Sequence, residues 1–234
     1  MKNLLIVLAF LLAPSFAHAV LLNGNFETGS LSPWSTIGDV SVVDSSFGSD
    51  PPQGHLQVLI TNAPETSFGE HPQSYSGTNS AGFSTFTAFF DILHVPGDPF
   101  AAVYEGSGIK QSFIANTDIF LSFTWKFLTD EGFGGLFDPR FYVLDRIQYI
   151  LFPTGAASLS PTPFLAEFGY ETTTIFVSAG PHTLGFGVFD TADTFTNSGL
   201  LLDDISFRFI PEPPTWLLLG FGLIVIARVR LRVA

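Results

Sequence analysis

The sequence predicts an all-β protein whose main domain is an antiparallel β-sandwich with one short helix. Short apolar or alternating segments recur along the chain, and Gly, Pro, Asn and Asp separate them. Segments of this length, divided by turn residues, are typical of the strands of a sandwich. Composition agrees, because 46% of the residues are hydrophobic, Phe occurs 27 times and Cys is absent. The domain must therefore be held by its hydrophobic core, by a metal ion or by both, and not by disulfides.

Alternation is clearest in the segment Ile119–Thr129, where polar and apolar side chains follow one another. Successive side chains of a strand point to opposite faces of the sheet, so this pattern predicts one outer face and one core face. We expect Trp125 to be a core residue. The outer face carries Phe120, Ser122, Thr124 and Lys126, and the core face carries Leu121, Phe123, Trp125 and Phe127.

Seven further segments have the composition of strands and are bounded by turn residues. The region Pro153–Pro163 is expected to be a surface loop. The seven segments are Val40–Asp44, His55–Thr61, Ile109–Ala115, Arg140–Leu151, Thr173–Val177, His182–Asp190 and Leu200–Ile210.

One helix is expected between Ser84, which would cap its start, and Pro96, which lies beyond its end. Its apolar residues recur at i, i+3, i+4 and i+7, the spacing of one helix face. These residues are Phe86, Phe89, Phe90 and Leu93.

The first 19 residues have the features of a secretory signal peptide. Lys2 precedes the apolar run Leu4–Leu12, and Ala17 and Ala19 place small residues at the third and first positions before a cleavage site. We expect signal peptidase to cut after Ala19. The alternative is an N-terminal membrane anchor, but the run is far shorter than the roughly 20 residues that span a bilayer.

The C-terminal residues have the features of a transmembrane segment. Trp216–Ala227 contains no charged residue, and Arg228, Arg230 and Arg232 follow it. Arginines of this kind hold one end of a helix in the cytoplasm, and Trp216 would sit at the other interface. With the arginine side chains snorkelling, about 20 residues are available to span a bilayer. A buried core helix is the alternative that these residues leave open.

Pro211, Glu212 and Pro213, followed by the apolar segment and the terminal arginines, resemble the PEP-CTERM sorting signal. The arginines alternate with Val229 and Leu231, whereas in the family they stand together. The resemblance implies export across the inner membrane of a Gram-negative bacterium that makes exopolysaccharide. It also implies that exosortase, a membrane-embedded protease, cuts near Pro211–Pro213. The expected organisation is a signal peptide at 1–19, a β-sandwich domain at 20–210 and a sorting and anchor segment at 211–234.

Two segments of the body carry a second resemblance. Asn23–Gly29, followed by Trp34, is similar to the first strand of jelly-roll domains related to carbohydrate-binding modules. Leu201–Phe207 resembles their last strand. In those modules the two strands lie close together, and a structural calcium often sits between them. The resemblance implies that the sandwich is of the jelly-roll kind.

Asp203 is a candidate calcium ligand on physical grounds as well. If the last strand alternates regularly, Asp203 shares an apolar core face, where an unpaired carboxylate is very costly. Calcium prefers carboxylate and backbone oxygens, and the resemblance makes Glu27 the second ligand. The alternative is that Asp203 caps a sheet end or accepts hydrogen bonds from backbone amides. The residues on this expected face are Leu201, Asp203, Ile205, Phe207 and Phe209.

A second acidic group consists of Asp130, Glu131 and Asp138, beside the Gly-rich segment Gly132–Gly135. No EF-hand spacing is present, so we expect a solvated turn, and a calcium-binding loop is the alternative. Aromatic side chains that would in principle stack on sugars are Trp34, Trp125, Tyr75, Tyr104 and Tyr142.

Charge argues against nucleic acid as a partner. The chain has 21 acidic and 9 basic residues, and three of the basic ones lie among the last seven residues. An acidic body repels phosphates and suits a solvated surface or divalent cations.

Catalytic motifs are missing from the sequence. The histidines do not form an H-E-x-x-H zinc motif, and no G-x-S-x-G nucleophile elbow occurs. The sequence therefore favours a non-catalytic exported surface or matrix protein, sorted by exosortase and associated with extracellular polysaccharide. A lectin-like module with a defined sugar site is the first alternative, and a glycoside hydrolase with paired carboxylates is the second. The histidines outside the signal peptide are His55, His71, His94 and His182.

Overall fold

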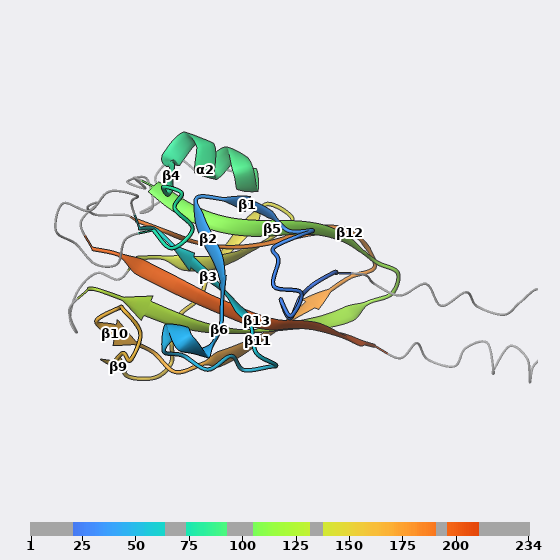
Figure 1. Cartoon of the computed structure of the whole chain (residues 1–234). Coiled ribbons are helices and arrows are strands. Elements are labelled where there is room, and N and C mark those ends of the chain that lie inside the picture. Colours follow the sequence, from blue (N-terminus) through green and yellow to red (C-terminus); the bar gives the residue numbers. More distant parts are fainter. Residues whose placement is uncertain (1–20, 64–73, 93–104, 132–137, 191–195, 211–234) are drawn as a thin grey trace, which may run out of the picture.

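The computed structural model describes residues 21–63, 74–92, 105–131, 138–190 and 196–210. They form two antiparallel sheets packed face to face, with an apolar core between them (Figure 1). This architecture confirms the expected sandwich of the jelly-roll kind. The signal peptide and the anchor expected at the two ends lie outside the described residues. Within the described ranges, no helix has the length and apolar character needed to cross a membrane.

The first sheet has the strand order β1-β5-β12-β7-β8, and β4 also pairs with β5. The expected strand Arg140–Leu151 is wrong in one respect, because it is two strands joined by a tight turn at Asp145 and Arg146. Both turn residues have positive φ, 51° and 75°, as a two-residue hairpin turn requires. Asp-Arg lacks the glycine that normally signals such a turn. The strands are β1 (Ser35–Ile37), β4 (Ala81–Gly82), β5 (Glu105–Ala115), β7 (Arg140–Leu144), β8 (Ile147–Ile150) and β12 (Gly180–Phe189).

The second sheet has the order β2-β3-β13-β6-β10-β9, and β11 pairs with β6. A 3-10 helix, η1 (Ser45–Phe47), follows β2. The expected loop Pro153–Pro163 contains β9, which is too short to show alternation. The strands are β2 (Asp39–Val43), β3 (Gln57–Thr61), β6 (Ile119–Thr129), β9 (Ser158–Leu159), β10 (Ala166–Glu167), β11 (Glu171–Val177) and β13 (Ser198–Phe209).

The core between the sheets is rich in aromatic side chains. Trp125 is 2% exposed and lies in it, as expected. Its indole N–H donates to the Thr173 hydroxyl at 2.9 Å, so the polar end of the ring is satisfied inside the core. The alternation expected for β6 is confirmed, since its odd-numbered residues from Ile119 to Phe127 all belong to the core.

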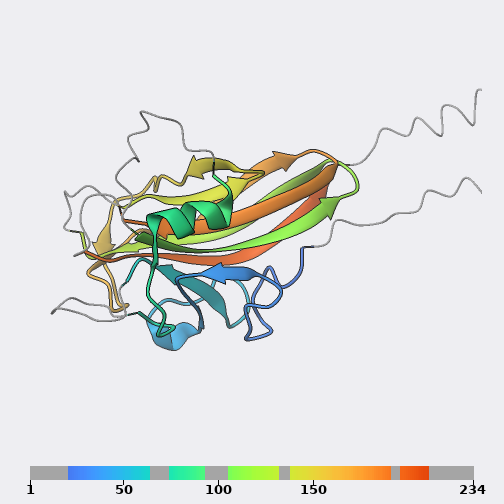
Figure 2. The ribbon, with the colours of Figure 1, turned by 90° about the horizontal axis from the view of Figure 1, so that it is seen from above.

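The helix α2 (Phe83–Phe90) lies on the outer face of the first sheet (Figures 1 and 2). Its Phe86 and Phe90 rings pack there in a second cluster. Glycines in the strands beneath make this possible: a Cβ on Gly108 would lie 2.4 Å from the Phe90 ring. The floor consists of Gly106, Gly108 and Gly185, where a Cβ would meet the Phe86 or Phe90 ring.

The bounds of α2 differ from the expected ones. Gly82 stands at the N-cap without a side-chain hydrogen bond, so Ser84 is not the cap but lies inside the first turn. The helix ends at Asp91, whose φ of 53° is left-handed. It therefore stops before Leu93, which lies outside the described residues.

A β-bulge interrupts the last strand. β13 pairs with β6 up to Asp203, opposite Thr124, and the register resumes at Ser206. One extra residue is accommodated there, and Asp204 takes a φ of 48°. A bulge of this kind reverses the faces of the residues on either side of it.

The expected core face of the last strand is therefore wrong for Leu201 and Asp203, before the bulge, and right for Ile205 and Phe207, after it. Before the bulge, Leu200 and Leu202 face the core, whereas Leu201 packs in a separate outer cluster. After the bulge, Ile205 and Phe207 face the core. Asp203 shares the outer side with Leu201, so its burial has another cause than the sandwich core.

The segment Asn23–Gly29 forms turns where a first strand was expected. Asn23 and Phe26 have φ values of 53° and 54°, which a regular strand does not allow. The segment nonetheless lies against β13, because the Gly24 carbonyl accepts the Ile205 N–H at 3.0 Å. The expected proximity to the last strand is thus confirmed.

Candidate functional site

Asp203 is fully buried although it lies on the outer side of its sheet. The segment between β2 and β3 covers it, and the Gln53 N–H of that segment donates to Oδ2 at 2.9 Å. The N–H of Asp204, the next residue of β13, donates to Oδ1 at 2.7 Å. Burial, aided by the charges of Asp204 and Glu27, raises the pKa of Asp203 to about 6, and the two amide bonds oppose that rise. The backbone alternative weighed for this residue is therefore present in the structure.

Glu27 holds the same segment from the other side. Its Oε1 accepts the N–H groups of His55 at 2.7 Å and Leu56 at 2.8 Å, and these bonds lower the pKa of Glu27. Glycine is required at position 54, because its φ is +69° and a Cβ there would lie 2.4 Å from Oε1 of Glu27. Glu27 and Asp203 thus anchor one short segment together.

Glu27 and Asp203 are carboxylates, the ligand type that calcium prefers. Burial makes ionisation of Asp203 unfavourable, and the charge of Glu27 adds to that cost, which a bound cation would relieve. In the described part of the chain, no group of three or more His, Cys, Asp or Glu side chains is placed to hold a metal. Calcium takes six to eight oxygens, so main-chain or water oxygens would complete the shell. Calcium at Glu27 and Asp203 stays a prediction.

An open groove lies beside η1. Its hollow has a volume of about 500 Å³, and its walls include Phe47, Leu56, Tyr75 and Pro163. The Phe47 and Tyr75 rings meet edge to face with centroids 5.4 Å apart. Asp44 lies on the polar side of the groove and caps η1, because the Ser46 N–H and hydroxyl both donate to its Oδ1.

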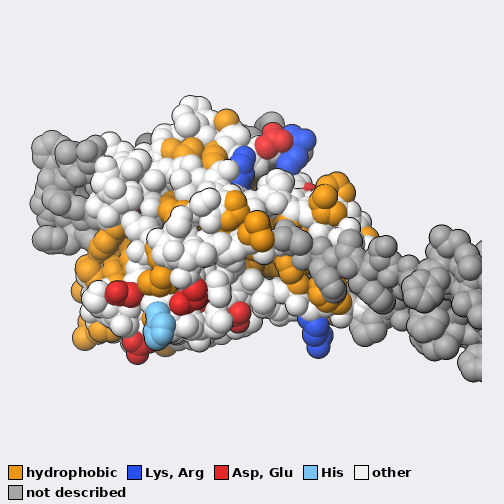
Figure 3. Space-filling model, turned by 45° about the vertical axis from the view of Figure 1, so that its right-hand side comes forward, with side chains coloured by type: hydrophobic (Ala, Val, Ile, Leu, Met, Phe, Trp, Pro, Cys, Tyr) orange, Lys and Arg blue, Asp and Glu red, His pale blue; other side chains and the backbone are white. Residues whose placement is uncertain are grey.

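A second hollow of about 350 Å³ continues from Asp44 to Asp50 and His55. We call the two together the η1 groove. Figure 3 shows acidic side chains gathered around a histidine on one face of the molecule, with hydrophobic side chains beside them. Aromatic rings next to carboxylates suit a ligand that has apolar faces and hydroxyl donors.

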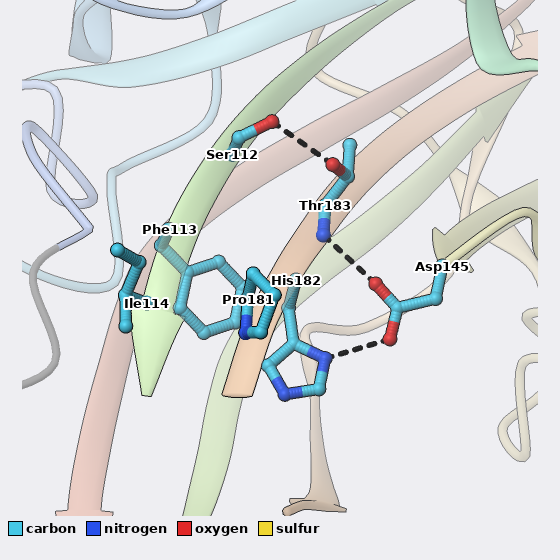
Figure 4. Close-up of a pocket in the computed structure, with 7 residues that line it drawn as sticks. All are labelled: Ser112, Phe113, Ile114, Asp145, Pro181, His182 and Thr183. Carbon is cyan, nitrogen blue, oxygen red and sulfur yellow. Dashed lines mark hydrogen bonds and ion pairs between the residues drawn. The ribbon is translucent and has the colours of Figure 1, made fainter. Parts of the chain in front are cut away.

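A third hollow, of about 400 Å³, lies at the ends of β5 and β12 (Figure 4). His182 Nδ1 lies 2.6 Å from Asp145 Oδ2, which resembles the histidine–carboxylate pair of a hydrolase. However, Nε2 contacts the Ser178 carbonyl at 2.8 Å and no hydroxyl. The Ser112 hydroxyl pairs with that of Thr183 at 2.9 Å. The pair therefore ties two turns together and activates no nucleophile among the residues of this hollow.

The second acidic group is mostly structural. Asp138 is 3% exposed and accepts the Asn62 side-chain N–H at 2.8 Å. A solvated turn is therefore wrong for this residue. Asp130 accepts the Leu165 N–H, and Glu131 accepts the hydroxyl of Thr196. The neighbouring Gly132–Gly135 lies outside the described residues.

The candidate aromatic residues divide between core and groove. Trp34 is 5% exposed, and its indole N–H donates to the Asn23 carbonyl at 3.1 Å. Tyr142 is half-buried between Phe123 and Tyr149. Tyr75 lines the η1 groove together with Phe47. Phe47 was not among the candidates predicted from the sequence, although the helix cap Asp44-Ser45-Ser46 directly precedes it. The candidates outside the described residues are Tyr104, His71, His94, Pro211, Glu212, Pro213, Arg228, Arg230 and Arg232.

The sequence matches no family model. A search of curated proteins finds no match either. A carbohydrate-binding module, TmCBM61 in complex with β-1,4-galactotriose, is 14% identical with a TM-score of 0.37 over 83% of this chain and 100% of its own. A family 35 carbohydrate-binding module from an environmental isolate is 16% identical with a TM-score of 0.27, over 58% of this chain and 91% of its own.

The enzymatically active domain of bacteriophage CBA120 tailspike protein 4 is 11% identical with a TM-score of 0.40. The match covers 81% of this chain but only 21% of the tailspike chain. At these identities and TM-scores, the comparisons assign no function to this chain.

Proposed function

We propose that this chain is an exported, non-catalytic surface protein that binds carbohydrate in the η1 groove. One observation carries the proposal: two aromatic rings and a charged carboxylate line the same open hollow of about 500 Å³. The hollow is large enough for a short stretch of a polysaccharide chain. Sugar rings present C–H groups on their faces and hydroxyl groups at their edges, which match this lining.

The polar side of the groove is suited to hydroxyl donors. Hydrogen bonds from the Ser46 hydroxyl and amide lower the pKa of Asp44, so the carboxylate is ionised at neutral pH. An ionised carboxylate only accepts hydrogen bonds and has more lone pairs than the two bonds on Oδ1 use. Sugar hydroxyls are donors of the required kind.

The groove is also held in shape before any ligand arrives. The buried carboxylate of Asp39 accepts the N–H groups of Tyr75 at 2.9 Å and Ser76 at 2.6 Å. Gly48 closes η1 in a left-handed conformation with φ 101°. A preformed site loses less conformational entropy on binding, which favours affinity.

Calcium at Glu27 and Asp203 is the second part of the proposal, with a structural role. The two carboxylates hold the segment Gln53–Leu56, and Leu56 also lines the groove. An ion there would stiffen one wall of the sugar site.

Sorting is the third part of the proposal, and it rests on the sequence resemblance. The chain would cross the inner membrane of a Gram-negative bacterium, lose residues 1–19 to signal peptidase and stay anchored by 211–234. An exosortase-type protease would then cut near Pro211–Pro213. A role in extracellular polysaccharide follows from this location together with the groove.

Binding to a glycan array followed by titration calorimetry tests the groove. Phe47→Ala should weaken binding of any glycan that is recognised by about tenfold, because one aromatic contact is lost. Phe152→Ala is the matched control, since Phe152 is 72% exposed and lies outside the groove. Binding that survives Phe47→Ala, or an array without a single ligand, would contradict the proposal.

A further inference from the structure

Both ends of the described chain leave the sandwich at the same end of the molecule (Figures 1 and 2). The strand register places the end of the last strand there. Ile119, at the start of β6, pairs with Phe209 at the end of β13 and with Val177 at the end of β11. The Ile210 N–H then donates to the Asp118 carbonyl in the turn before β6. We call this part of the molecule the terminal end.

Large apolar side chains are exposed around the terminal end. Leu22 is 54% exposed, Ile114 59%, Phe176 55% and Phe209 40%. Ile114 lies next to Pro181, its register partner (Figure 4). Exposed apolar side chains grouped at one end of a soluble domain mark an interaction surface.

The two carboxylates near this end each accept a backbone N–H and remain exposed. Asp118 accepts the Ala179 N–H at 2.9 Å, and Asp145 accepts the Thr183 N–H at 2.9 Å. Arg208 is also exposed and lies over the Phe120 ring at 5.4 Å. The end therefore presents charges of both signs, and its exposed apolar side chains are the groups suited to a bilayer.

The chain that follows limits how far this end can be from a membrane. The apolar run begins at Trp216, only six residues after Ile210. Six extended residues reach roughly 20 Å at most. With the apolar run in a bilayer, the terminal end is held close to the lipid surface, where even weak contacts form at a high effective concentration.

We propose that the terminal end of the sandwich docks on the bilayer that holds the C-terminal segment, with Ile114, Phe176 and Phe209 against the lipid. The proposal rests on the membrane anchoring in the proposed function. Docking holds Pro211–Pro213 at the bilayer surface, within reach of a protease embedded there.

A lipid surface fits this end better than a second copy of the chain does. Ile114 and Pro181 lie on the first sheet, whereas Phe176 lies on the second. Apolar groups on both sheets form a rim and not one flat patch, and a stable protein interface needs a continuous area of about 1,200 Å² or more. A fluid surface adapts to a rim.

The absence of Cys allows a direct test with single introduced cysteines. Ala179→Cys places a fluorescent label in the exposed β11–β12 turn at the terminal end. Ala156→Cys places it near β9, which joins the other end of β6 through β10. The full chain, purified from the inner membrane after export, is reconstituted in phosphatidylethanolamine–phosphatidylglycerol vesicles that contain a lipid-bound quencher.

The label at 179 should be quenched and the label at 156 should not. Ile114→Asp with Phe176→Asp should lower the quenching at 179 about fivefold, because each carboxylate opposes the anionic surface. Leu159→Asp is the matched control, since Leu159 is 73% exposed and lies away from this end. All variants should sediment with the vesicles alike.

Equal quenching at 179 and 156, or quenching at 179 that the double variant leaves unchanged, would overturn the docking. Quenching that depends on protein density in the vesicle would identify a second copy as the occupant and reject lipid. A chain that does not sediment with vesicles at all would refute the anchor itself, and with it the docking.

Discussion

The burial of Asp203 leads to a prediction about stability and pH in the metal-free domain, residues 20–210. Its pKa rises from an ordinary 3.8 to about 6 in the folded state, with burial as the main cause. As the pH rises from about 4 to about 6, the unfolded chain loses this proton first, so the unfolded state gains stability relative to the folded state. A shift of about two units corresponds to about 3 kcal/mol. That contribution is present below pH 4 and lost above pH 6.

Asp203→Asn isolates this effect, because it keeps the side-chain shape and an acceptor but cannot ionise. Other groups titrate in the same range, since burial also raises the pKa of Glu105 while hydrogen bonds lower that of Asp44. Their contributions are the same in wild type and in Asp203→Asn, so they cancel in the difference between the unfolding free energies of the two proteins. Urea unfolding with chelator, followed by the fluorescence of the buried Trp34 and Trp125, measures that difference from pH 4 to pH 7.

As the pH rises from 4 to 7, the unfolding free energy of the wild type should fall by about 3 kcal/mol relative to that of Asp203→Asn. Calcium should return the loss, because it binds the ionised carboxylates, and about 2.7 kcal/mol is expected at a hundredfold excess over Kd. A difference that stays constant with pH would refute the reasoning about burial. A pH-dependent difference that calcium leaves unchanged would reject calcium binding but not the effect of burial. The hydrogen bonds from the Gln53 and Asp204 amides would then be the only interactions that stabilise the Asp203 carboxylate.

Three further predictions follow. Gly108→Ala should destabilise the domain by about 1–3 kcal/mol in thermal unfolding, since the new Cβ would meet the Phe90 ring, whereas Gly155→Ala, with nothing within 4 Å, should change little. Intact mass of the exported form should give a chain beginning at Val20, and a chain that still begins at Met1 would rule out the signal peptide. Replacing Pro211, Glu212 and Pro213 with Ala should leave the precursor in the inner membrane, as membrane fractionation and blotting would show, and normal processing of that variant would reject the sorting assignment.

Local side-chain patterns were enough to predict most strands and the main core residues. The segment Ile119–Thr129 has the expected bounds, and Trp125 has the expected burial, because a strand with one buried face must alternate along its own sequence. The pattern fails where the backbone departs from regularity without a glycine. The examples are residues of positive φ: Asp145 and Arg146 in the β7–β8 turn, and Asp204 in the bulge of β13.

The candidate sites depend on contacts between segments that are far apart in the sequence. Glu27 and Asp203 were paired through a resemblance, but the segment that both hold, Gln53–Leu56, carries no motif that marks it. The η1 groove likewise brings Phe47 together with Tyr75 and Pro163. The packing of the two sheets and of the loops that cover them decides which surfaces meet. Packing is a property of the whole chain, and the local alternation of polar and apolar residues does not encode it.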